Sequence, residues 1–282
     1  MDTIGAHLAR KSDNFLLLRI IAALMVIYGH SFPLTWDIGA GELFLKLGWR
    51  IYSGDIAVDL FFVISGFMVA GSFLARSSLP VFLSARVLRI VPAYACYLIV
   101  FAFAIGPLLG VLPATQYFAS SEPVTYVLQN LRFSSELVWT LPGVFTDHRL
   151  ITVNGVLWTL PAEMRMYLLV AAMGVLGLLG NRWLGLLTII GLFVAAAFNP
   201  QLLPLHTDWV KLSGFFCLGI LAQLFKDRIQ VRHDVLLVLV AITYISYNTQ
   251  SYFWLLAVSI AYFSFWFAYR TPVLTLERFG DP

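Results

Sequence analysis

The sequence predicts an all-α fold, a polytopic integral membrane bundle of about eight spanning helices, and three observations lead to this prediction. Of the 282 residues, 60% are hydrophobic and only 12% are charged, about half the charged share of a soluble domain. Apolar runs long enough to cross a bilayer recur along the chain. The two cysteines lie in apolar stretches without partner spacing, which indicates neither a disulfide framework nor a zinc site.

Six apolar runs are clear, and a seventh is divided by polar residues. The predicted spans are residues 15–33, 56–74, 91–112, 159–180, 183–199, 210–225, 234–247 and 252–269. With the N-terminus in the cytoplasm, most of the 18 basic residues fall at the inner ends of these spans, as the positive-inside rule requires. Eight spans return the chain to its starting side. The net charge of +3 arises at these loop ends, so it does not indicate nucleic acid binding.

The first span, NFLLLRIIAALMVIYGHSFP (residues 14–33), holds one arginine and one histidine. Titratable groups inside a span are costly to keep and are functional-site candidates. Arg19 and His30 are eleven residues apart, so they leave the helix on nearly the same face, roughly 16 Å apart along its axis. Two alternatives stay open: Arg19 is only an anchor that reaches the headgroups, or His30 is an interfacial histidine bound to a backbone carbonyl.

The second span opens with GDIAVDLFFVISGF (residues 54–67) and places Asp59 inside the membrane or at its outer edge. A carboxylate there needs a partner, and the candidates are His30 and Arg165. The alternative is a carboxylate favoured by the helix N-terminus. Ser65 and Gly66 supply either a hydroxyl or, as we prefer, a close helix contact.

The segment FLSARVLRIVPAY (residues 82–94) carries Arg86 and Arg89 three residues apart, on one helical face. Two guanidinium groups on one face can hold phosphates bidentately, which suits a nucleotide-like ligand from the cytoplasm. A positive-inside anchor explains the same charges.

The segment NGVLWTLPAEMRMYLL (residues 154–169) brings a carboxylate and a phenol into a span. Glu163 and Tyr167 are four residues apart and face the same way, so the pair can orient a histidine or receive a proton. Trp158 suits the membrane interface. Arg165 points elsewhere, and an ion pair with Asp59 would explain it.

Two predicted outer loops complete the chain. Residues 34–55 contain an apolar set that can line one face of an interfacial helix, namely Leu43, Phe44, Leu47 and Ile51. Residues 113–158 are expected to form a substrate-facing lid, with a plain solvated connection as the alternative. No internal repeat or low-complexity linker divides the chain, so we expect residues 1–282 to form a single transmembrane domain.

Four motifs occur together: Arg-x10-His, DLFFVISGF, FLSARVLRIVPAY and WTLPAEMRMYLL. In this order and spacing the sequence resembles acyltransferase family 3, bacterial inner-membrane enzymes that O-acetylate surface polysaccharides, lipopolysaccharide, peptidoglycan or exported glycans. Two features differ. Met164 stands where the family often has a second acid, and the family usually has about ten spans. The end, LERFGDP (residues 276–282), resembles a late family motif that leads into another span, so we expect the chain to lack C-terminal spans.

The resemblance implies a membrane-bound O-acyltransferase of the bacterial inner membrane, and the distribution of basic residues predicts a cytoplasmic N-terminus. The donor substrate would be acetyl-CoA or another acyl-CoA, with no permanently bound cofactor and no metal. The acceptor would be a glycan or a lipid-linked sugar. In this interpretation His30 is the general base, and Glu163 or Asp59 holds its ring. The expected substrate-binding residues are Arg19, Arg86, Arg89, Ser65, Trp158 and Tyr167.

Two other functions fit the same residues. In a translocator of polysaccharide or lipid intermediates, the buried charges would line a pathway rather than a reaction centre. The third interpretation is a pseudoenzyme that serves as an assembly partner.

Overall fold

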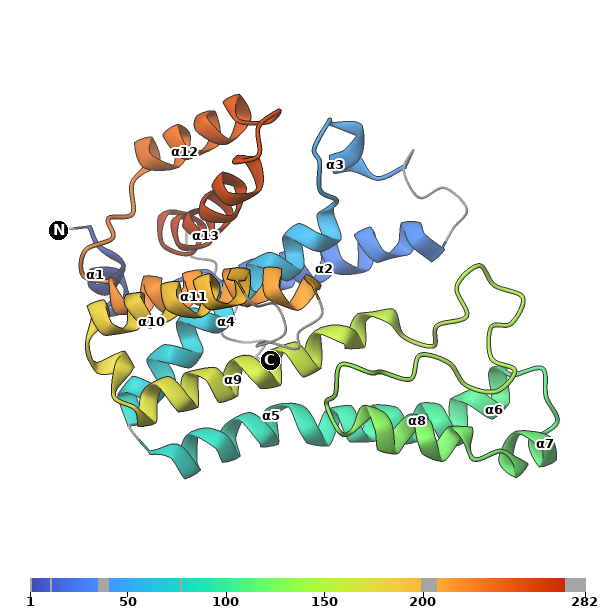
Figure 1. The fold of residues 1–282 in the computed structure, drawn as a ribbon. Coiled ribbons are helices and arrows are strands. Elements are labelled where there is room, and N and C mark those ends of the chain that lie inside the picture. Colours follow the sequence, from blue (N-terminus) through green and yellow to red (C-terminus); the bar gives the residue numbers. More distant parts are fainter. Residues whose placement is uncertain (1, 11, 35–40, 77, 199–206, 272–282) are drawn as a thin grey trace.

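The computed structural model describes residues 2–10, 12–34, 41–76, 78–198 and 207–271, and the regular elements in these ranges are helices (Figure 1). The long helices are α2 (Phe15–Leu34), α4 (Ser53–Arg76), α5 (Leu79–Val100), α9 (Thr159–Val175), α10 (Arg182–Phe198), α11 (Thr207–Leu224), α12 (His233–Ile245) and α13 (Tyr252–Arg270). The short ones are α1 (Ile4–Leu8), α3 (Leu43–Lys46), α6 (Gly106–Leu109), α7 (Ala114–Ala119) and α8 (Glu122–Asn130). The predicted all-α membrane bundle is confirmed.

The structure agrees with the positions of the predicted spans more closely than with their number. Each predicted segment overlaps a helix, and 5 helical stretches in the described ranges are long and apolar enough to cross a membrane. They include a continuous stretch from Leu79 to Leu109, in which the π-helical turn η1 (Phe101–Ile105) joins α5 to α6. The helices α10 and α12 are shorter, and α11 carries Asp208 and Lys211. The count of eight therefore stays a prediction.

The two ends of the described chain meet at one side of the bundle. The Asn14 N–H, just before α2, donates a hydrogen bond of 2.9 Å to the carbonyl of Ala268, near the end of α13. At a predicted outer loop, Arg50 donates a bond of 2.9 Å to the carbonyl of Tyr247. The predicted inner end before α2 thus contacts the predicted inner end of α13, and two predicted outer loops contact each other. This is what an even number of crossings between the start of α2 and the end of α13 requires. Residues 276–282, with the LERFGDP motif, lie outside the described residues.

Helix α4 is the central element, and it contacts α2, α5, α9, α11 and α13 (Figure 1). A Cβ added at Gly66 would lie 2.0 Å from the Phe216 carbonyl oxygen, and one added at Gly219 would lie 2.1 Å from the Val63 carbonyl oxygen. Only glycine permits this approach of α4 and α11, and such small residues drive helix association in lipid. The packing role predicted for Gly66 is confirmed.

Asp59 forms an ion pair with a residue that the sequence analysis did not consider. Its carboxylate is fully buried, and Oδ2 lies 3.1 Å from the Nζ of Lys211 on α11, whose side chain is 40% exposed. The predicted partners, His30 and Arg165, are wrong. The reason is that α11 packs directly on α4, and spacing within one helix does not show which helix lies opposite.

The outer segment 113–158 packs on α5 and is not a plain solvated connection. The π-helical turn η1 interrupts the α-helical hydrogen-bond ladder, and the buried Tyr117 hydroxyl of α7 donates a bond of 2.8 Å to the Ala102 carbonyl there. Asn130, at the end of α8, holds both the N–H and the carbonyl of Val138, at 3.0 and 2.9 Å. In the other outer loop, α3 is only one turn long and Ile51 is buried, so the predicted interfacial face is only partly formed.

We expect Lys211→Met to lower the free energy of unfolding by about 1 to 2 kcal/mol, because it leaves the buried Asp59 carboxylate without its partly exposed partner. The double variant Asp59→Val with Lys211→Met should recover most of this loss, since it no longer buries a carboxylate without a partner. Unfolding in mixed detergent micelles measures both. The exposed Lys46→Met is the control and should change stability by less than about 0.5 kcal/mol. A double variant as unstable as the single one would contradict this account.

Candidate active site

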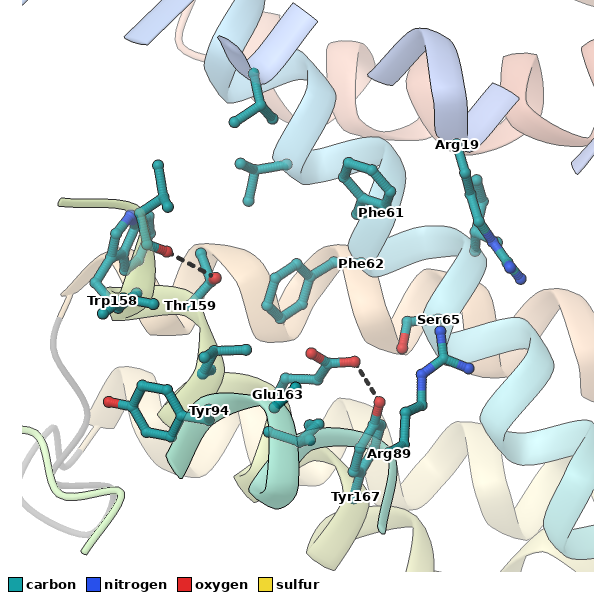
Figure 2. Close-up of a pocket in the computed structure, with 18 of the residues that line it drawn as sticks. Arg19, Phe61, Phe62, Ser65, Arg89, Tyr94, Trp158, Thr159, Glu163 and Tyr167 are labelled. Carbon is teal, nitrogen blue, oxygen red and sulfur yellow. Dashed lines mark hydrogen bonds between the residues drawn. The ribbon is translucent and has the colours of Figure 1, made fainter. Parts of the chain in front are cut away.

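A cavity of about 570 Å³ lies between α2, α4, α5, α9 and the turn η2 (Gly155–Trp158), a size typical of small-molecule sites. All the predicted site residues except Asp59 line it: Arg19, His30, Ser65, Arg86, Arg89, Trp158, Glu163 and Tyr167. Figure 2 labels six of them, all but His30 and Arg86. Four helices therefore bring the motifs of the sequence analysis into one space.

One end of the cavity is strongly basic. Arg19 of α2 contacts the thioether of Met68. Arg86 of α5 donates a hydrogen bond of 3.0 Å to the Ser72 hydroxyl, and Arg89 follows one turn later. In Figure 2, Arg19 and Arg89 lie on the same side of the cavity, next to Ser65. Three guanidinium groups from two helices favour an anionic ligand at this end.

Glu163 and Tyr167 face each other on α9, as their spacing predicted. The Tyr167 hydroxyl donates a hydrogen bond to the Glu163 carboxylate (Figure 2). The Arg86 guanidinium lies 5.5 Å from the centre of the Tyr167 ring, and both Arg86 and Arg89 interact electrostatically with this phenol. The pair lies at the middle of the cavity, and one carboxylate against three arginines leaves the lining positive.

His30 is held by its own helix. Its Nδ1 lies 2.9 Å from the Val26 carbonyl oxygen, and because a carbonyl only accepts, Nδ1 must carry the proton in this bond. In the neutral ring Nε2 then holds the free electron pair. The sequence analysis gave the ring of His30 two possible partners, a carboxylate of Glu163 or Asp59 or, as the alternative, a backbone carbonyl. In the described part of the chain the bond goes to the backbone carbonyl of Val26, one turn earlier on the same helix.

The contact of α2 with α4 fixes the position of the imidazole. A Cβ added at Gly29 would lie 2.5 Å from the Gly54 nitrogen, and one added at Gly54 would lie 3.0 Å from Nδ1 of His30. The Tyr52 ring lies 5.9 Å from the imidazole, centre to centre. The ring of His30 is therefore confined between the backbone of α4 and the Tyr52 phenol.

The sequence analysis did not predict two neighbours of His30, the phenol of Tyr52 and the carboxyl group of Asp55. Burial, and then the carboxyl groups of Asp55, Asp59 and Glu42, raise the pKa of Tyr52 to about 12, so Tyr52 stays protonated at neutral pH. Asp55 interacts electrostatically with Lys211 and His30. The available signal was in the string GDIAVD, where Asp55 precedes Asp59 by one helical turn.

Arg165 and Trp209 do not line the cavity themselves but lie behind Trp158, which does. The guanidinium donates to the carbonyls of Phe133 and Pro161, at 3.0 and 3.1 Å, and lies 4.5 Å from the centre of the Trp209 ring. Trp209 in turn donates a bond of 3.2 Å to the Trp158 carbonyl. Arg165 thus fastens the outer segment to α9 and α11, a role that spacing within its own helix could not show.

The described residues contain no group of three His, Cys, Asp or Glu side chains that could hold a metal ion. The groups that can act on a ligand in the cavity are therefore an imidazole, one carboxylate, several hydroxyls and three guanidinium groups. Together they can bind an anion at one end and exchange a proton further along.

Comparisons with known proteins agree with this arrangement. The sequence profile of the acyltransferase 3 family, described as an acyltransferase domain, matches residues 13–277. An "O-acetyl transferase" of Shigella phage Sf6 is 35% identical over 109 residues. That match covers 39% of this chain and 31% of the phage protein. No solved structure matches the chain. Since the family profile spans nearly the whole sequence, the chain belongs to the acyltransferase 3 family.

Proposed function

We propose that the protein transfers an acyl group, in the first place acetyl, from cytoplasmic acyl-CoA to a hydroxyl of a cell-envelope or exported glycan. The observation that carries the proposal is that one cavity joins His30 to Arg19, Arg86 and Arg89. Family membership and the similarity to a phage O-acetyl transferase support acyl transfer over simple translocation.

The basic end of the cavity is the proposed donor site. Coenzyme A carries several phosphate charges, and Arg86 and Arg89 project from one face of α5 to meet them. The positive-inside distribution of the basic residues supports placing this end at the cytoplasmic face of the inner membrane. The thioester then extends from the arginines along the cavity towards His30.

His30 is the proposed general base. Its Nε2 takes the proton of the acceptor hydroxyl as the hydroxyl oxygen attacks the thioester carbonyl. The C–S bond breaks, the acyl group forms an oxygen ester, and the coenzyme A thiolate leaves and takes the proton back from the imidazolium. The bond to Val26 keeps Nδ1 protonated and leaves Nε2 free for this task.

Glu163 lies between Arg89 and Trp158, and Tyr167 lies beside Arg89 (Figure 2). Their hydrogen bond fixes both side chains beside the path of the donor. We propose that this pair positions the acyl chain. The Glu163 carboxylate also neutralises part of the positive charge of the arginines, so coenzyme A can dissociate after the reaction.

His30→Ala should lower acyl transfer by at least about 100-fold, the usual contribution of a general base. Transfer of radiolabel from acetyl-CoA to envelope glycans in isolated membranes measures it. His148→Ala is the matched control, because His148 is exposed in the outer segment, where its side chain contacts Asp147 and Phe145, and it does not line the cavity. Full activity of the His30 variant, at equal expression, would refute the assignment.

Arg89→Ala should raise the KM for acetyl-CoA about 10-fold or more with a smaller change in kcat, because it removes one charge-assisted contact to phosphate. It should also reduce the rise in Tm that coenzyme A produces in detergent. The control is Arg228→Ala, an exposed basic residue outside the cavity. If coenzyme A fails to raise the Tm of the unmodified protein, the translocator becomes the better explanation.

A further inference from the structure

The lining of the cavity changes character from one end to the other. In Figure 2, Tyr94 and Trp158 lie on the opposite side of Glu163 from Arg19 and Arg89. Around Tyr94 and Trp158 the lining consists of Tyr97 and residues 156–160, none of which ionises at neutral pH. The end far from the proposed donor site is therefore neutral, aromatic and rich in hydroxyl groups.

The phenol of Tyr94 is an unexplained polar group at this neutral end. The residue is only 4% exposed, and its hydroxyl is buried and has no hydrogen-bond partner among the described residues. Buried hydroxyls nearly always have a partner, so an exception calls for a specific explanation such as a ligand. Tyr97, one turn further along α5, also lines the cavity.

The neighbouring phenols keep their protons. Burial, and then the nearby Tyr97 and Tyr94, raise the pKa of Tyr126 on α8. Tyr97 also interacts with Asn154, just before η2. The three phenols and this amide form a neutral cluster of donors and acceptors, in which Tyr94 and Tyr97 line the cavity and Tyr126 and Asn154 interact with Tyr97. The groups that line the cavity match the hydroxyl groups of a sugar in kind.

Phe133, which packs against Tyr94, has an unfavourable backbone conformation. Phe133 has a φ of 52°, a left-handed conformation that is unfavourable for a bulky side chain and is typically retained at functional sites. Its ring packs on Tyr94 at 5.2 Å, centre to centre, while Arg165 holds its carbonyl. These contacts fix the Tyr94 ring, so its hydroxyl is presented in one direction.

From this geometry we infer that the neutral end of the cavity is the acceptor subsite, and that it takes an uncharged sugar whose hydroxyls bond Tyr94 and Tyr97 while its ring lies against Trp158. The inference rests on the proposed function, because it supplies the hydroxyl that His30 activates. The preference for an uncharged sugar follows because the labelled arginines lie on the other side of Glu163 (Figure 2) and His30 acts as a neutral base, so a sugar carboxylate would lose its water without gaining a cationic partner.

The test uses the full-length protein reconstituted in liposomes, with radiolabelled acetyl-CoA and a glycan fraction from the envelope of the host cell. Tyr94→Phe and Tyr97→Phe should each raise the KM for the glycan roughly 3- to 10-fold, the usual effect of one lost neutral hydrogen bond. The KM for acetyl-CoA should not change. Tyr244→Phe, which alters an exposed phenol on α12, is the matched control. Mass spectrometry of the depolymerised product should find the acetyl group on an uncharged sugar.

The other outcomes separate the two proposals. If the unmodified protein transfers no label, the proposed function fails and the subsite fails with it. If it transfers label but neither phenylalanine variant changes the KM for the glycan, the subsite alone is refuted. A raised KM for acetyl-CoA in these variants would place the phenols in the donor site instead. Acetyl groups found on an acidic sugar would overturn the inferred specificity.

Discussion

The close approach of α4 to its neighbours sets the position of every group in the cavity. In lipid, helices gain little from burying apolar surface against one another, so close packing and polar contacts must hold them. Glycine at positions 66 and 219 brings α4 against α11, and the Asp59–Lys211 pair adds an electrostatic contact between the same helices. The same helix then presents Ser65 to the cavity. Asp59 therefore contributes to the site by helping to hold α4 against α11, although it does not line the cavity.

Charge is distributed along the cavity in a way that fits two different ligands. The arginines are gathered at one end, where Arg86 keeps a hydroxyl partner in Ser72. The imidazole donates to a backbone carbonyl, and the phenol of Tyr94 lies on the far side of Glu163 from the arginines. A donor that carries phosphates and an acceptor that carries hydroxyls can thus approach the same imidazole from opposite directions, each matched to the chemistry of its own end.

Much of the site could be predicted from the sequence, because much of it depends on spacing within one helix. Arg86 and Arg89, or Glu163 and Tyr167, share a face for reasons of helix period alone. Contacts between helices could not be read in this way. Lys211 as the partner of Asp59 and Phe133 as the partner of Arg165 depend on which helices pack together and on the path of an outer segment.

The two phenols of the proposed acceptor subsite were missed for a different reason. Tyr94 and Tyr97 lie in an apolar helix rich in aromatic residues, where phenols resemble ordinary packing residues, and only the structure shows that the Tyr94 hydroxyl is buried without a partner among the described residues. Their separation of three residues, continuing the helix that carries Arg86 and Arg89, was the available signal. The number of spans was also uncertain, because helices such as α12 are shorter than a bilayer requires.

The glycines beside His30 restrict how this chain can vary. A single methyl group at Gly54 would press on the imidazole itself, and one at Gly29 would push α4 away from α2. Architecture and chemistry therefore constrain the same two positions, whereas a lipid-facing residue of α2 such as Leu24, which is 61% exposed, can be exchanged for another apolar side chain. Substitutions in α2 should accordingly be tolerated on its lipid-facing side and not at the positions that contact α4.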